Sequence, residues 1–420
     1  MLNISKQKNR ILGAMLILAV CFTIGYYLFY TGSRRPSNGN NKIYVSDLTK
    51  ETIDASVALS AKYLVKHCDD RGQFVYRVNL DPNVKIKPKY NILRHAGSVY
   101  ALAMYLGRYD DGDARGALIR SARFLIEQTI RPIPGEDGVH AIWSPAKMCG
   151  RKGNDVAKLG GTGIGLVALI EAEKVVPGTV SKDQLGKLGK FILHMQKKNG
   201  SFYSKYIPEK GGRDDSWTSL YYPGEAALGL LMLYEKDPRP EWFQGALNAM
   251  TYLSSLRQRR VIVEADHWAL LATDKLLSAG RPESEDKIVG HGVKICRSIL
   301  AGVSRYHEGS PEYGALTAIG STTQTAIRLE GLLAAMSFLP EKDGMLKKRV
   351  GAAVREGMVF LLRSQVQEGD YAGGFPRIAP SFALMNKKES KGDTRRDYEI
   401  RIDYVQHAMC AMMQYSDRFL

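Results

Sequence analysis

The residues of this chain that could do chemistry recur in short polar stretches, each of which leads into a small, apolar segment. Collected, they are Arg94 and His95; Thr162; Tyr221, Tyr222 and Glu225; Glu264, Asp266, His267 and Trp268; Thr323 and Gln324; and Arg401, Asp403, Tyr404, Gln406 and His407. Aromatic rings stack on sugar faces, amides and guanidinium groups bind hydroxyls or carboxylates, and acids with His or Tyr move protons. The mixture therefore predicts a polar site for a sugar.

Two interleaved series of helices are expected to position these groups. The first pairs an aromatic residue with Leu or Ile at helical spacing and carries charge on one face, with members near Ser60, Ser121, Leu188, Ala249 and Gly357. A sixth helix, from Lys287, is less similar. The second has a polar start and a body rich in Ala and Gly, with members that begin at Arg94, Gly160, Tyr221, Glu264, Ser321 and Arg401. Strand-like alternation is scarce. The pattern predicts an all-α fold, an (α/α)6 toroid of about twelve helices, with the polar starts at its mouth.

This layout resembles the six-hairpin toroids of glycoside hydrolases, polysaccharide lyases and sugar epimerases, and the related toroids of terpenoid cyclases and prenyltransferases. The segment "FILHMQKKNGSFY" is similar to the glutamine-and-aromatic repeat of terpenoid cyclases, with Phe202 where that repeat usually has tryptophan. The resemblance covers about residues 51–420 and assigns no specific family. It implies an architecture, which does not fix a chemistry.

Hydrolysis of a glycosidic bond needs two carboxylates that flank the bond. Glu225 and Asp266 are the predicted pair, with Asp403 in reserve, and a glycoside hydrolase is the preferred function. Each acid also has a structural explanation. Asp266 could cap a helix, and Glu225 lies in a first turn where the helix dipole favours a carboxylate.

Lyase or epimerase chemistry on a uronic acid stays open and would need a base beside the sugar carboxylate. His407, His95 and Tyr222 are the candidates, and Arg94 or Arg401 could neutralise the carboxylate. His407 is therefore grouped with the catalytic acids. The predicted substrate-binding residues are Arg94, His95, Tyr221, Tyr222, His267, Trp268, Gln324, Arg401 and Gln406.

No metal or cofactor site is predicted. The "GGTGIG" segment from Gly160 has neither Rossmann nor P-loop spacing, so its small residues are expected to allow close helix packing. His291 and Cys296 lack two further ligands at fixed spacing, which argues against a zinc prenyltransferase. The D-x-D-D acid of squalene-type cyclases is absent, which argues against terpenoid cyclization.

The N-terminal region predicts a membrane anchor. Residues 11–30 are twenty residues without a charge, long enough to span a bilayer as a signal-anchor helix between a short cytoplasmic tail, 1–10, and a polar linker, 31–50. Basic residues precede the span at Lys6, Lys8 and Arg10 and follow it at Arg34 and Arg35, a balance that favours a cytoplasmic N-terminus. The predicted location is the cell membrane, single-pass, with the toroid domain, 51–420, outside the cytoplasm.

The formal charge of +16 favours acidic partners. A polar or anionic glycan is expected, and nucleic acid is not, because the domain is predicted to lie outside the cytoplasm. The alternative function is a non-catalytic glycan- or partner-binding subunit of a polysaccharide synthesis, export or cell-envelope complex. The cysteines are too sparse for a disulfide framework, although one bridge stays open.

Overall fold

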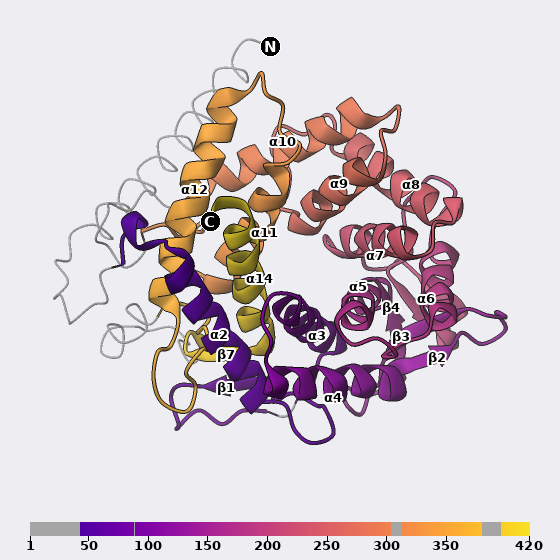
Figure 1. Cartoon of the computed structure of the whole chain (residues 1–420). Coiled ribbons are helices and arrows are strands. Elements are labelled where there is room, and N and C mark those ends of the chain that lie inside the picture. The colour runs from indigo at the N-terminus through magenta and orange to yellow at the C-terminus, as the bar shows by residue number, and fades with distance from the viewer. Residues whose placement is uncertain (1–42, 88, 304–312, 380–395) are drawn as a thin grey trace, which may run out of the picture. The chain divides into compact units, whose positions relative to one another are not determined.

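Helices that are apolar on all sides alternate along the chain with amphipathic ones, and they form two concentric rings (Figure 1). The computed structural model describes residues 43–87, 89–303, 313–379 and 396–420. The inner helices there are α3 (Ile92–Leu106), α5 (Leu159–Val175), α7 (Tyr222–Lys236), α9 (His267–Ala279), α11 (Thr322–Ala335) and α14 (Ile402–Phe419). The outer helices are α2 (Lys50–Lys66), α4 (Gly112–Thr129), α6 (Lys182–His194), α8 (Pro240–Leu256), α10 (Glu285–Ala301) and α12 (Gly344–Ser364).

The inner ring is closed by its last helix. Each inner helix packs against the next one, and α14 packs against both α11 and α3. Each outer helix covers the inner helices beside it, as α4 covers α3 and α12 covers α11. The described residues thus form the predicted toroid, and every one of the twelve predicted helices is present.

Burial explains which series became which ring. In the inner helix α5 every residue from Leu159 to Ile170 is buried. In the outer helix α6 the buried residues Leu185, Leu188 and Ile192 recur at helical spacing, and the opposite face is charged. A helix that is apolar all round needs neighbours on all sides, so it takes the inner position.

Glycine allows α5 and α7 to approach closely, as the sequence predicted for the "GGTGIG" segment. A Cβ atom on Gly163 would lie 2.7 Å from the backbone carbon of Glu225, and one on Gly229 would lie 2.9 Å from the carbonyl oxygen of Gly163. Any side chain at these positions would push the two helices apart. The same contact fixes the start of α7, and with it Glu225, against α5.

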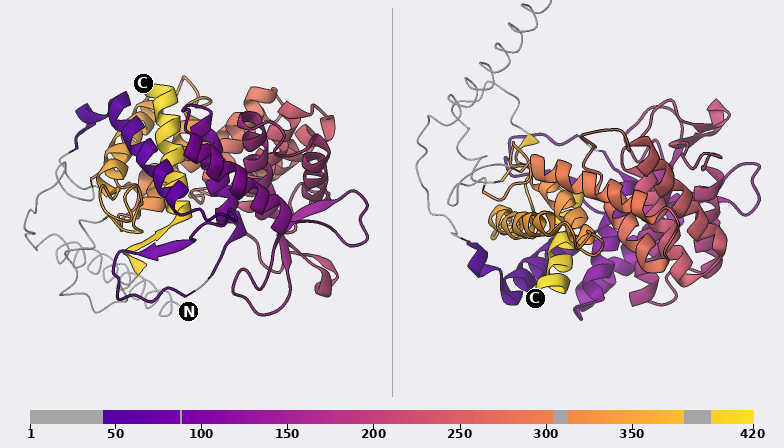
Figure 2. Two further views of the ribbon diagram at one scale, coloured as in Figure 1. Left: turned by 60° about the horizontal axis from the view of Figure 1, so that its bottom comes forward. Right: turned by 90° about the horizontal axis from the view of Figure 1, so that it is seen from above.

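Short strands qualify the all-α prediction. Strand β1 (Arg77–Asn79) pairs with β7 (Glu399–Arg401), and an antiparallel sheet contains β2 (Ile130–Pro132), β3 (His140–Ser144), β4 (Val156–Lys158), β5 (Lys205–Ile207) and β6 (Gly212–Asp214). Single 3-10 turns, η1 (Val45–Asp47) and η2 (Pro208–Lys210), complete the described elements. The strands lie toward the end of the ring opposite the end of α14 (Figure 2). With one exception each has only three residues, too few to show an alternating pattern.

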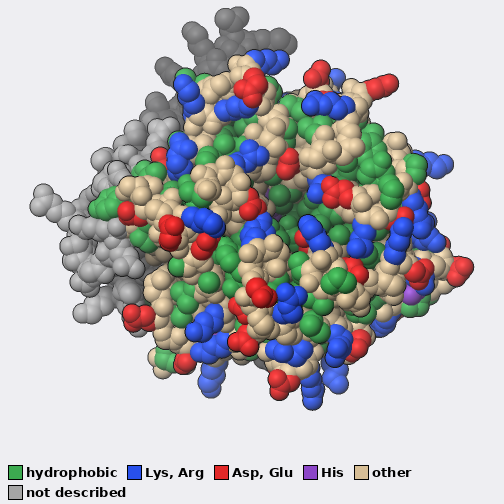
Figure 3. Space-filling view, in the orientation of Figure 1, with side chains coloured by type: hydrophobic (Ala, Val, Ile, Leu, Met, Phe, Trp, Pro, Cys, Tyr) green, Lys and Arg blue, Asp and Glu red, His purple; other side chains and the backbone are tan. Residues whose placement is uncertain are grey.

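The predicted membrane anchor, 11–30, lies outside the described residues. None of the helices that the structure describes is long and apolar enough to cross a membrane. The compact unit begins at Ile43, so η1, which the predicted linker includes, belongs to it. On the face seen in Figure 3, where α14 ends, acidic and basic side chains are intermixed, so the positive charge of the chain forms no continuous patch there.

Candidate active site

The six inner helices run in the same direction, so their polar starts lie at one end of the ring. Local sequence sets where these helices begin. The Asn91 side chain accepts hydrogen bonds from the backbone N–H groups of Leu93 and Arg94 at the start of α3, and Ser321 caps α11 in the same way through Gln324. Caps of this kind hold the first turns in place, and with them the functional side chains.

Three buried groups from three inner helices meet at the centre of this end. His407 Nδ1 of α14 lies 2.8 Å from Glu330 Oε2 of α11, and His267 Nε2 of α9 lies 3.9 Å from the same oxygen. The two imidazole rings are 5.5 Å apart between centroids, at 78° to one another. Two imidazoles beside one carboxylate can accept, hold and return protons.

His267 is the more enclosed of the two histidines. It is 1% exposed, and among the described residues neither of its ring nitrogens has a hydrogen-bond partner. Burial, with the charges of His407 and Arg94, holds the pKa of His267 well below its ordinary value, so the ring is neutral at physiological pH. Tyr221 meets it edge-on at 5.2 Å, and Trp268 lies at 4.9 Å between ring centroids.

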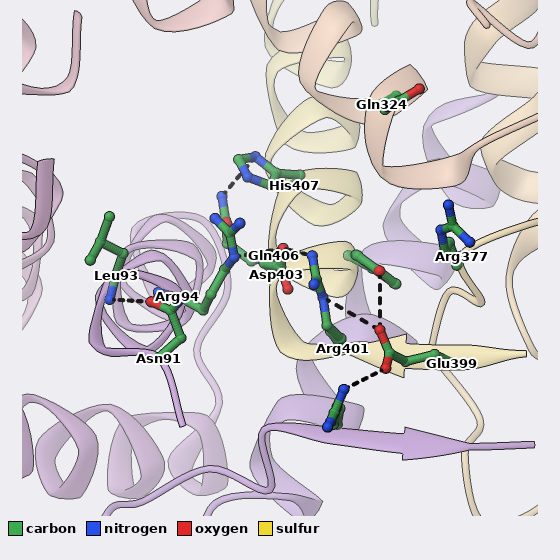
Figure 4. Close-up of polar contacts among 12 residues, drawn as sticks. Asn91, Leu93, Arg94, Gln324, Arg377, Glu399, Arg401, Asp403, Gln406 and His407 are labelled. Carbon is green, nitrogen blue, oxygen red and sulfur yellow. Dashed lines mark hydrogen bonds and ion pairs between the residues drawn. The ribbon is translucent and has the colours of Figure 1, made fainter. Parts of the chain in front are cut away.

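An arginine pair holds Asp403 on the first turn of α14. Arg94 Nε and an Arg401 guanidinium nitrogen each lie 2.9 Å from Asp403 Oδ2, and Figure 4 shows both side chains directed at that carboxylate. Burial opposes ionisation of Asp403, but the two arginines outweigh it and lower the pKa of its carboxyl. Arg94 keeps 35% of its side chain exposed, so it can still face a ligand.

Glu225 is a buried carboxyl of the opposite kind. Its Oε2 atom is buried, and no described group hydrogen-bonds to it. Burial raises the pKa of Glu225 to about 8, with Asp266 adding to the rise and Arg94 opposing it. Glu225 is therefore mostly protonated at neutral pH and can donate a proton.

Asp266, the second predicted acid, is engaged by the protein itself. One carboxylate oxygen accepts a hydrogen bond from the backbone N–H of Ala269 at the start of α9, and the other lies 3.0 Å from Arg257. Arg257 also lies 3.2 Å from His291 Nε2. Burial raises the pKa of Asp266, and Arg257 opposes the rise. These contacts favour the capping role over a catalytic one.

The structure separates the other predicted residues into two groups. Gln406 lies beside His407, with Nε2 3.2 Å from Nδ1, and Tyr222 packs against α5 next to Glu225. His95 instead lies in the core under α4, where Tyr90 and the carbonyl of Ser121 occupy both ring nitrogens. Gln324 is exposed at the start of α11 and lies apart from Arg94 and Asp403 (Figure 4). The structure does not bring these last two residues to the histidine pair.

Glu330 is a functional candidate that the sequence reasoning missed. It lies in the third turn of α11, beyond the polar start, in the segment "AIRLEGLLAAM". The available signal was a carboxylate just before the apolar end of an inner helix, because charged groups are almost never buried without a partner. Burial raises the pKa of Glu330, and His407 opposes the rise.

The same three residues could hold a metal ion. One ligand atom from each of His267, Glu330 and His407 lies within 4.8 Å of the others, and two imidazoles with a carboxylate are a known zinc set. Sequence spacing could not reveal this set, because its members come from three separate helices. Proton transfer and metal binding are thus both chemically available to the trio.

Sequence comparison matches this chain to no family model and to no curated protein. Its fold is similar to that of cellobiose 2-epimerase from Bacillus thermoamylovorans, with 13% sequence identity and a TM-score of 0.62. The match covers 88% of this chain and 100% of that one. A sugar epimerase from a ruminal bacterium has 11% sequence identity and a TM-score of 0.61, and the match covers 88% of this chain and 99% of that one. An unsaturated glucuronyl hydrolase specific for heparin has 10% identity and a TM-score of 0.57, and the match covers 88% of this chain and 98% of that one. The resemblance to six-hairpin toroids is confirmed, and at these identities it concerns the fold.

Proposed function

We propose that the chain is a carbohydrate-active enzyme that moves a proton on and off a sugar carbon, as an epimerase or isomerase does. The observation that carries this proposal is the pair of imidazoles, His267 and His407, on two inner helices with Glu330 between them. Similar folds occur in a sugar epimerase, a mannose isomerase and cellobiose 2-epimerases. Hydrolysis, the function preferred from the sequence, becomes the second candidate.

The chemistry uses the two histidines in opposite roles. In an open-chain sugar, a neutral imidazole removes the proton from the carbon beside the carbonyl group, and the electron pair moves onto the carbonyl oxygen. His267 is neutral and suits this role. His407, which contacts Glu330, delivers a proton to the opposite face of the carbon, and the electron pair returns from the oxygen to form the new carbon–hydrogen bond. Arg94 stabilises the negative oxygen of the intermediate, so no other reactant is needed.

Access to His267 requires a movement. Its ring is closed to water, whereas His407 keeps 7% of its side chain exposed. Tyr221 is half-buried and meets His267 edge-on. We propose that the sugar displaces the Tyr221 ring on entry, so that the small residue in Tyr221→Ala should admit the sugar more readily than wild type does.

The test is hydrogen exchange in heavy water. The full chain is incubated with aldoses, uronic acids and short glycans, and deuterium at the carbon beside the carbonyl group is followed by NMR. Deuterium incorporation without chain shortening supports the proposal, and its absence with every sugar contradicts it. A parallel sample treated with a chelator separates the two uses of the trio. Retained exchange fits proton transfer, while loss that zinc restores assigns the trio to a metal.

Hydrolysis is favoured by one observation, the protonated Glu225. A general acid must hold its proton at working pH, and the pKa of Glu225, about 8, meets that condition. The second carboxylate would be Asp403 or Asp266, and arginines hold both. Shortened glycans that carry the label from heavy-oxygen water would establish this alternative.

The cellular setting is a further part of the proposal. Residues 11–30 would anchor the chain in the cell membrane, with the toroid outside the cytoplasm, where a polar or anionic glycan or an envelope complex could reach it. Alkaline extraction of membranes tests the anchor, and protease added to intact cells tests the orientation. Release of the chain by alkali would contradict anchoring.

A further inference from the structure

Two lysines lie directly opposite each other in the five-stranded sheet. The register of the antiparallel pair β4 and β5 places Lys158 opposite Lys205. Residues at such paired positions point to the same face of a sheet with their Cβ atoms close together, and like charges there are destabilising. The pair therefore weakens the sheet unless an anion lies near both ammonium groups.

Within the described residues, neither lysine forms a close ion pair with an acid. Among the described residues, Lys158 forms no ion pair and no side-chain hydrogen bond. The Lys205 ammonium lies 4.8 Å from the ring centroid of Trp217, over its face. Asp214 is opposite Lys205 on its other side and accepts hydrogen bonds from Ser216. These bonds lower the pKa of Asp214, and the charges of Lys210 and Lys205 lower it further, so Asp214 balances part of the charge of Lys205. Lys158 has no acidic partner among these residues and Lys205 has only a distant one, so an outside anion could bind between the two ammonium groups.

The lysine pair belongs to the same end of the ring as the histidines. Lys158 is the residue immediately before α5, an inner helix. Burial lowers the pKa of Lys158, and repulsion from Arg151, Lys205 and Arg94 lowers it further. Arg94 is also close enough to His267 to lower the pKa of that ring. The charge of Arg94 thus acts on both the lysine pair and the candidate active site.

Trp217 adds an exposed aromatic face to this group. It is 49% exposed, and its ring meets that of Tyr222, at the start of α7, at 5.7 Å and 76°. Tyr222 in turn packs beside Glu225 against α5. An exposed indole held in place by a second ring offers a flat surface on which a sugar can stack.

We propose that Lys158, Lys205 and Trp217 form a subsite for an anionic sugar residue, which is linked to the sugar that reacts at His267 and His407. The sugar ring stacks on the face of the indole that Lys205 does not cover, and the two ammonium groups bind its carboxylate or sulfate group. The second half of this statement rests on the proposed function, whereas the binding itself does not.

The experiment measures binding and exchange separately on the full chain. Calorimetry gives the Kd for a uronic acid disaccharide, a sulfated disaccharide and a neutral disaccharide. The double variant Lys158→Gln/Lys205→Gln should bind the anionic ligand that wild type prefers at least fivefold more weakly and the neutral one unchanged, and added salt should narrow the difference. The matched control is Lys210→Gln, an exposed lysine in the turn between β5 and β6, which should change no Kd.

A second substitution tests the stacking surface. Trp217→Ala should weaken binding of all the disaccharides, and Trp217→Phe should restore much of it, which a general loss of folding would not allow. Equal binding of anionic and neutral ligands by wild type, or an unchanged Kd in the double lysine variant, would overturn the subsite.

Two further outcomes distinguish the sugar subsite from the proposed function and from a membrane-binding role of the lysines. Charge-dependent binding without any deuterium incorporation would leave the subsite standing while the proposed function fails. Anionic phospholipid vesicles serve as a third ligand class. Binding of wild type to such vesicles that the double variant loses, with no effect on disaccharide binding, would assign the lysines to a membrane surface and overturn the sugar subsite.

Discussion

Asp403 and Glu225 are both buried carboxyls in the first turns of inner helices, yet their surroundings give them opposite charge states. Two arginines keep the pKa of Asp403 below its ordinary value. Glu225 lacks such a pair, and burial raises its pKa to about 8. Burial alone therefore does not decide what a polar group at the ring mouth does. Of these two carboxyls, Asp403 with its arginines supports the structure, and Glu225 without such a pair keeps a proton that it can donate.

The largest effect is expected from removing a group that the proposed chemistry uses, His407, although it contacts Glu330. His407→Asn should reduce the rate of carbon–hydrogen exchange about 10²- to 10⁴-fold, the contribution typical of a general acid or base. His95→Asn is the control, because both nitrogens of His95 are bonded in the core. It should lower the free energy of unfolding by about 1–3 kcal/mol and leave the rate per folded molecule unchanged. Equal losses of exchange rate in the two variants would contradict a catalytic role for His407.

Breaking the paired side should act on stability. Asp403→Asn would leave Arg94 and Arg401 without their shared counter-charge, and removing one member of a buried pair costs about 3–5 kcal/mol. The lower end is expected, since water reaches Arg94, which is 35% exposed. Urea denaturation at neutral pH measures the change. A loss below about 1 kcal/mol would show that the arginines are solvated without Asp403.

The pH dependence of stability should differ between the two carboxyls. Glu225 binds its proton more tightly in the folded state, so its contribution to stability is lost as the pH rises from about 4.5 to about 8. Glu225→Gln should flatten that decline, which is on the order of a few kcal/mol. Asp403 acts in the opposite direction, because stability that depends on its low pKa is lost as the pH falls below about 3.8. Unfolding curves measured from below pH 3.8 to above pH 8 give the change of unfolding free energy with pH for each carboxyl.

The smallest effect is expected from an ion pair at the surface. Lys275 and Glu235 lie 2.9 Å apart but are 31% and 48% exposed, and pairs of this kind contribute about 0.2–1 kcal/mol. Lys275→Gln should therefore change the free energy of unfolding by less than Asp403→Asn does. A comparable loss would mean that burial does not set the value of these pairs.

Sequence periodicity was enough to predict the toroid, since inner and outer helices differ in how their apolar residues are spaced. It also placed the polar starts at one end of the ring. It could not tell that Asp266 would meet Arg257, or that His95 would turn toward α4, because these partners depend on helix rotation. Glu330 was missed because it lies in the third turn of α11, beyond the polar start, and Lys158 because it ends a strand too short to recognise.

Closure of the ring by α14 has a consequence for folding. Strand β7 and α14 complete contacts with the first elements of the unit, and the Arg77–Glu399 ion pair joins residues 322 positions apart. Contacts of such long sequence separation form slowly. During synthesis, the apolar sides of α3 and α11 that later contact α14 stay uncovered until α14 leaves the ribosome. The open ring is thus the stage at which this chain is most prone to aggregate.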